Sequence, residues 1–155
     1  MADTSKLSSI KPTPIALVVC DAIYQEPEGK TALIGLFSNI AAYCLPVRHP
    51  RMAVFASVTG LREGSYAKLE IVQGETENVI VSAGGPFPKG TTPLTIADLN
   101  FVLNNVVFPE EGTYFIRFWV NDYLLIMTHL QQLLDRGTRV VAQKRGFSGK
   151  ISLGV

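Results

Sequence analysis

The clearest secondary-structure signal in the chain is Thr113-Tyr114-Phe115-Ile116-Arg117-Phe118-Trp119-Val120. The even-numbered residues are all apolar and the odd-numbered set includes Arg117, so the two sets point to opposite faces of a strand. Asn121-Asp122 follows, and both residue types tolerate the left-handed backbone that a two-residue hairpin turn requires. The sequence therefore predicts a β-hairpin whose second strand runs from Tyr123 to Gln131.

Similar stretches recur along the rest of the chain, with turn residues between them. Glu26-Pro27-Glu28-Gly29 is typical of a hairpin turn, because proline presets φ and glycine adopts a positive φ. No segment predicts a helix longer than one or two turns. We therefore expect an all-β fold, a two-sheet sandwich of about eight antiparallel strands, at residues 15–20, 31–43, 52–59, 66–72, 77–83, 94–108, 113–120 and 123–131.

Two polar arms flank these strands. Residues 1–14 end in Lys11-Pro12-Thr13-Pro14, which favours extended backbone and not a domain. Residues 136–155 carry five basic side chains and no acidic one, which leaves a net charge of −4 on residues 1–135. We expect an N-terminal arm at 1–14, one β-sandwich domain at 15–131 and a basic C-terminal extension at 132–155.

Three segments also carry a resemblance: 16–21 (ALVVCD), 33–40 (LIGLFSNI) and 112–121 (GTYFIRFWVN). In this order they resemble a family of small bacterial and phage-borne proteins whose shared domain has no known function. The resemblance covers roughly residues 14–131. It implies a β-sandwich of immunoglobulin-like shape, and it implies no catalytic or ligand-binding residues.

The composition bounds the environment in which the chain works. No apolar run approaches the roughly 20 residues that span a bilayer, and residues 1–6 lack the pattern of a signal peptide. The cysteines, Cys20 and Cys44, are too few for a disulfide scaffold. Paired across the turn at 26–29, they would stand about 30 Å apart. We expect free thiols and a cytoplasmic protein, or part of an assembled particle if the chain derives from a phage.

Motifs for nucleotide binding, metal binding and catalysis fail at specific positions. Gly29-Lys30-Thr31 has the ending of a phosphate loop, but Tyr24 occupies the place of its first glycine. His49, expected in a connecting loop, and His129, expected on a surface strand, are the only histidines, and neither has short-range ligand spacing to a cysteine. We therefore expect a protein that is not an enzyme and that has no metal site and no cofactor.

The aromatic face of the predicted strand 113–120 is the strongest candidate for a binding surface. Phe115, Arg117 and Trp119 share that face. One interpretation is structural: the strand is buried on both faces, or the C-terminal extension covers Trp119. The other is an exposed aromatic platform that docks a partner or stacks on a sugar ring, with Phe87 from the 84–90 loop as an added wall.

We expect an interaction or assembly module that binds a second copy of itself or another protein. A phage-type structural component would suit the arms and the sheet edges that a sandwich must protect. The expected interface combines Phe115, Arg117, Trp119 and Phe87 with the basic residues Arg136, Arg139, Lys144 and Arg145. We do not expect nucleic acid as the partner. The alternatives are a module that binds a small ligand or carbohydrate, and an enzyme whose site the motifs do not reveal.

Overall fold

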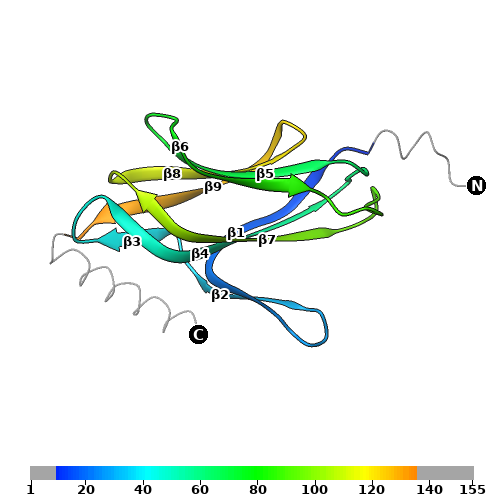
Figure 1. Ribbon diagram of the computed structural model, residues 1–155, viewed down its shortest axis with the longest axis horizontal. Coiled ribbons are helices and arrows are strands. Elements are labelled where there is room, and N and C mark those ends of the chain that lie inside the picture. The colour runs from blue at the N-terminus through cyan, green and yellow to red at the C-terminus, as the bar shows by residue number, and fades with distance from the viewer. Residues whose placement is uncertain (1–9, 136–155) are drawn as a thin grey trace, which may run out of the picture.

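The computed structural model describes residues 10–135, which form nine β-strands and no helix. The strands build two stacked sheets, one with the order β2-β1-β4-β7 and one with the order β3-β9-β8-β5-β6 (Figure 1). The predicted all-β sandwich is confirmed. The strands are β1 (Thr13–Gln25), β2 (Thr31–Leu36), β3 (Asn39–Ala42), β4 (Val47–Thr59), β5 (Tyr66–Gln73), β6 (Val79–Pro86), β7 (Ala97–Phe108), β8 (Gly112–Val120) and β9 (Tyr123–Leu134).

The hairpin predicted from residues 113–131 is present as β8 and β9, which pair antiparallel. Both turn residues have positive φ, 49° at Asn121 and 68° at Asp122. The side-chain Oδ1 of Asn121 also accepts a hydrogen bond from the backbone N–H of Tyr66, at 2.8 Å, which ties the turn to β5. The even-numbered face of β8 is fully buried: Tyr114, Ile116, Phe118 and Val120.

The core lies between the two sheets. Strand β4 is central to its sheet and contributes a row of buried side chains, Met52, Val54, Ala56 and Val58. Across the interface, Phe101 of β7 meets Phe118 of β8 edge to face, with ring centroids 6.3 Å apart. Because apolar residues alternate along the strands of both sheets, their inward-facing side chains form one apolar layer between the sheets. This layer is the main source of the stability of the sandwich.

The segment expected as a single strand at residues 31–43 is two strands that belong to different sheets. Strand β2 pairs antiparallel with the end of β1, and β3 pairs parallel with the end of β9. Phe37 and Ser38 connect them and carry the chain from one sheet to the other. The structure therefore has a ninth strand and one parallel pairing, because a single edge segment serves both sheets.

Several strands are longer than expected. Strand β1 begins at Thr13, inside the predicted N-terminal arm, and β9 continues to Leu134, inside the predicted extension. His49, expected in a loop, lies in β4, which begins at Val47 because β7 offers a pairing partner along its whole length. Gly84, expected in a loop, continues β6, where a Cβ atom would collide with the backbone carbonyl of Ala67.

One buried tyrosine fixes the corner between β7 and β8. The hydroxyl of Tyr114 donates a hydrogen bond to the carbonyl of Glu110 at 2.8 Å, and it accepts one from the N–H of Glu110 at 3.2 Å. The ring packs edge to face on Phe108, with centroids 5.0 Å apart. Immunoglobulin-type sandwiches use a tyrosine in a similar place to hold a strand corner.

We predict that Tyr114→Phe lowers the free energy of unfolding by about 1–2 kcal/mol, because both backbone groups of Glu110 lose a partner. Urea unfolding followed by circular dichroism measures the change. Tyr123→Phe is the matched control, since Tyr123 is 74% exposed. An equal effect of the two substitutions would contradict the role given to Tyr114.

We also predict that Tyr114 makes stability fall at alkaline pH. Burial raises the pKa of Tyr114 above its ordinary value of 10.0, against the opposing effect of its hydrogen bond to the backbone of Glu110. The unfolded chain therefore releases this proton first as the pH rises, and unfolding becomes easier above the ordinary pKa. Raising the pH from neutral to above the ordinary tyrosine pKa should lower the free energy of unfolding less in the Tyr114→Phe variant than in the unmodified protein. An equal decrease in the two proteins would contradict this prediction.

Candidate functional site

The odd-numbered face of β8 lies on the outside of the five-stranded sheet, as its alternation predicts. Phe115, Arg117 and Trp119 are all partly exposed there, between the buried residues of the opposite face. Lys68 and Glu70 of β5 stand beside this row, because Lys68 pairs with Trp119 and Glu70 with Arg117 in the register of the sheet. The outward face is therefore a mixed surface of aromatic rings and charges.

These side chains cover one another. The ammonium nitrogen of Lys68 lies 5.0 Å from the centroid of the Trp119 ring, and the guanidinium of Arg117 lies 6.0 Å from that of Phe115. Phe115 also packs edge to face on His129, with centroids 5.0 Å apart. Cations over aromatic rings are attracted to the ring face, so these contacts protect the rings that a ligand would use.

The charges of this face are also paired locally. Arg117 forms an ion pair with Glu77 at 2.8 Å, and Lys68 forms one with Glu70 at 3.1 Å. Neither the indole N–H of Trp119 nor the Nε of Arg117 has a hydrogen-bond partner, and both atoms are buried. The charges of this face are therefore paired within the chain, whereas these two N–H groups are not.

A depression of about 320 Å³ lies at the end of this face. Its walls are Tyr66, Lys68, Trp119, Asn121 and Asp122. Tyr66 is half exposed, whereas the side chain of Asn121 is already bonded to the backbone of Tyr66. Aromatic side chains beside polar groups are an arrangement on which a sugar ring can stack.

The remaining predicted interface residues do not join this face. Phe87 is only 5% exposed and packs in the core, so the expectation that it forms an exposed wall is wrong. It follows β6 with its N–H bonded to the carbonyl of Ser65, which turns its ring inward although two prolines flank it. The predicted basic residues lie outside the described residues: Arg136, Arg139, Lys144 and Arg145.

A second surface was not predicted from the sequence. The end of β1 and strand β2 form a two-stranded hairpin that projects from the sandwich (Figure 1). Register places Tyr24, Ile34 and Leu36 on one face of it, and they are 57%, 53% and 65% exposed. The sequence feature that could have indicated this surface is the segment 31–36, which has strand composition and no charged residue.

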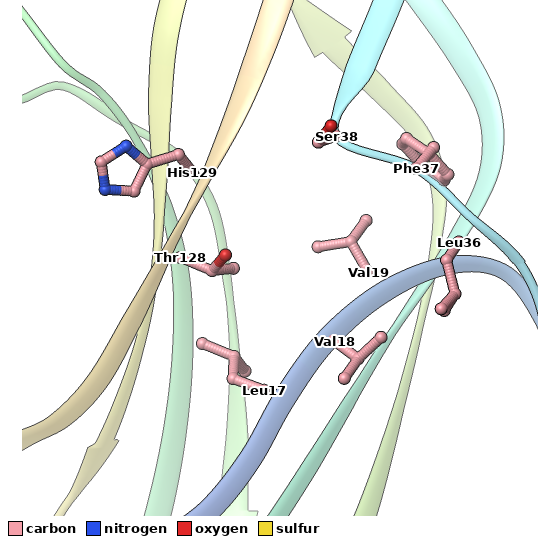
Figure 2. Close-up of a pocket in the computed structure, with 8 residues that line it drawn as sticks. All are labelled: Leu17, Val18, Val19, Leu36, Phe37, Ser38, Thr128 and His129. Atoms are coloured by element: carbon pink, nitrogen blue, oxygen red, sulfur yellow. The ribbon is translucent and has the colours of Figure 1, made fainter. Parts of the chain in front are cut away.

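A groove of about 300 Å³ opens between β1 and β9, where the two sheets meet at one side of the sandwich. Leu17 and Val19 of β1, Phe37 of the β2–β3 connection and Thr128 of β9 line it (Figure 2). The ring of His129 points away from it (Figure 2). The walls are therefore mainly apolar.

The described residues offer little for metal or thiol chemistry. Within residues 10–135, no three His, Cys, Asp or Glu side chains come together in a way that could hold a metal ion. Cys20 and Cys44 are free, the first buried and the second exposed. Burial raises the pKa of Cys20, so its thiol is a weak nucleophile at neutral pH. The same part of the chain contains no helix that could span a membrane.

Comparison with known proteins identifies the family of the chain. A family model described as a family of unknown function (DUF6941) matches residues 15–131. No curated protein matches the chain. The solved structures that are similar to it include three at 8–12% identity.

The first of these is the alkylpurine DNA glycosylase AlkC of Pseudomonas fluorescens bound to DNA with an abasic-site analogue, at 9% identity and a TM-score of 0.49. The match covers 84% of this chain, which spans only 33% of the glycosylase chain. An immunoglobulin-like protein of Pseudomonas aeruginosa matches at 8% identity and a TM-score of 0.41, and a CARDB domain of Pyrococcus furiosus in complex with metal ions at 12% and 0.39. Each of these two matches covers 79% of this chain and 96% of the other protein's chain.

We predict that Lys68→Ala exposes the ring of Trp119, the single tryptophan of the chain. Quenching of its fluorescence by acrylamide should rise about twofold, and loss of the contact should cost about 0.5–1 kcal/mol of stability. Lys89→Ala is the control, because Lys89 lies in an exposed loop. Unchanged quenching in the Lys68 variant would show that the ammonium group does not cover the ring.

Proposed function

We propose that this chain, which belongs to a family of unknown function (DUF6941), is an assembly module that binds further copies of itself and performs no chemistry. The observation that carries this proposal is the projecting hairpin of β1 and β2. Large apolar side chains are exposed on one face of it, and no other described element covers them. Exposed apolar patches of this kind mark interaction surfaces in soluble domains.

The energetic argument concerns three side chains. Tyr24, Ile34 and Leu36 each keep about half or more of their surface in solvent. Burying that remainder would stabilise a complex by on the order of 1 kcal/mol for each side chain, at about 25 cal/mol per Å². The outer face of the four-stranded sheet adds Val102, which is 48% exposed.

A second copy of the chain suits this face better than a charged partner does. The other residues that the register places on this face are Cys20, Ala22 and Ala32, and none of them is charged, so two copies meet without placing like charges opposite each other. The net charge of the whole chain is +1, which gives little long-range repulsion between copies. A two-fold interface, in which the same patch occurs on both sides, has the symmetry that most homo-oligomers use.

Two other binding functions are alternatives to self-association. A different protein could occupy the hairpin, as a component of a larger particle would require. A carbohydrate could occupy the depression between Tyr66 and Trp119, although Lys68 already lies over the tryptophan ring. The third alternative, an enzyme, has no observation among the described residues in its favour.

We predict that Ile34→Lys with Leu36→Lys abolishes self-association, because two charges would be buried in the interface. Sedimentation velocity should show an oligomer for the unmodified chain and a monomer for this variant, with circular dichroism unchanged.

The matched control is Leu94→Lys with Ile96→Lys, because these side chains are 79% and 64% exposed at a site away from the hairpin. It should associate like the unmodified chain. A monomeric unmodified chain would overturn the proposal, and equal loss of association in both variants would move the interface away from the hairpin.

A further inference from the structure

The depression beside the β8–β9 turn has a fixed frame. Two hydrogen bonds tie the turn to the first residue of β5: the N–H of Asn121 donates to the carbonyl of Tyr66 at 3.0 Å, and its Oδ1 accepts from the N–H of Tyr66 at 2.8 Å. The Nδ2 of Asn121 also donates to the hydroxyl of Ser65 at 3.4 Å. The backbone that carries Tyr66 and Asp122 is therefore held in place before a ligand binds, which lowers the entropic cost of binding.

Polar groups in the walls of this depression lack partners. Within residues 10–135, neither the phenol hydroxyl of Tyr66 nor the carboxylate of Asp122 forms a hydrogen bond or an ion pair. The indole N–H of Trp119 is buried and has no acceptor. Nearly all buried polar groups in folded proteins are hydrogen-bonded, so an unpaired donor in the wall of a depression points to a ligand that supplies the acceptor.

The charges of the depression favour a neutral ligand. Lys68 is paired with Glu70 at 3.1 Å, which leaves Asp122 as the unpaired charge among the lining residues. An anionic ligand would meet the carboxylate of Asp122, and a cationic ligand would lie beside the ammonium of Lys68. Hydroxyl groups, in contrast, can donate to the carboxylate and accept from the ammonium, which has three N–H donors.

We propose that this depression binds a neutral sugar in its pyranose form, stacked on the ring of Tyr66. The side chain of Tyr66 is 50% exposed, so its ring offers an open face to the C–H groups of a sugar. Asp122 accepts hydrogen bonds from the sugar hydroxyls, and Lys68 donates to their oxygens. The volume of about 320 Å³ lies at the lower end of the range for ligand pockets, about 300–1,000 Å³, which suits a single sugar unit.

Trp119 is both a wall of the site and its reporter, because it is the single tryptophan of the chain. The ammonium of Lys68 lies 5.0 Å from the centroid of its ring. The side chain of Lys68 is 37% exposed and has a flexible stem, so a ligand can move it. A bound sugar therefore changes the surroundings of the indole, and its oxygens can accept the unpaired N–H.

The site does not rest on the proposed self-association. Its lining residues belong to β5, β8 and the β8–β9 turn, and none of them lies on the hairpin of β1 and β2. A sugar can therefore bind whether or not the hairpin is covered by a second copy.

Titration of the full chain with sugars tests the proposal. The probes are glucose, galactose, mannose and N-acetylglucosamine, each added to about 100 mM, because ligands with so few atoms bind with dissociation constants on the order of 1 mM or weaker. At least one should give a saturable change in the fluorescence of Trp119 and saturation-transfer signals in its NMR spectrum. Glycerol, sodium phosphate and choline chloride should give neither.

Two substitutions locate the binding. Tyr66→Ala should weaken it about tenfold through loss of the stacking ring, whereas Tyr66→Phe should keep most of the affinity. Asp122→Asn should weaken it about threefold to tenfold, because asparagine tolerates the positive φ of 68° but lacks the negative charge. Tyr43→Ala is the matched control, since Tyr43 is 84% exposed and follows β3, which pairs with the far end of β9.

The absence of a saturable response to all four sugars, in both measurements, would overturn the proposal. Equal affinity in Tyr66→Ala and the unmodified chain would also overturn it, because the sugar would then bind elsewhere. If circular dichroism shows that Tyr66→Ala does not fold, Asp122→Asn decides, and an unchanged affinity in that variant counts against the site. A response to phosphate or choline without a response to any sugar would assign the depression to a charged ligand and overturn the sugar.

Discussion

Strand β1 changes its pairing partner at Cys20, and the features that bear on function depend on that exchange. Its first half pairs with β4 inside the sandwich, and its second half pairs with β2 outside it. Buried backbone groups must find partners, so a strand that leaves one sheet needs another strand beside it. The exchange produces both the projecting hairpin and the half-strand that borders the apolar groove.

The two outward surfaces of the molecule differ in how far their side chains satisfy one another. On the outer face of β8 and β5, Arg117 and Lys68 lie over aromatic rings and are paired with glutamates. On the hairpin, Ile34 and Leu36 have no such cover within the described chain. A surface whose charges are already paired and whose rings are already covered gains little apolar burial from a partner, whereas an uncovered apolar surface gains the free energy of desolvation. This difference favours assembly through the hairpin and not through the aromatic face.

Sequence patterns predicted the local features well. Strict alternation identified β8 and both of its faces, and Asn121-Asp122 identified the turn. Structural features that depend on contacts between residues far apart in the sequence were not predictable. The division of residues 31–43 into β2 and β3 requires β9 as a partner, and the burial of Phe87 requires the core around it. The cover of Trp119 by Lys68 joins residues on different strands, which no local pattern reveals.

The most direct measurement is the absolute mass of the unmodified full chain by light scattering, over a wide range of protein concentration. One copy has a mass of 16.9 kDa. Self-association through the hairpin predicts a mass that rises with concentration to at least that of a dimer, because the hairpin face of one copy covers that of another. A mass of one copy at every concentration would contradict it.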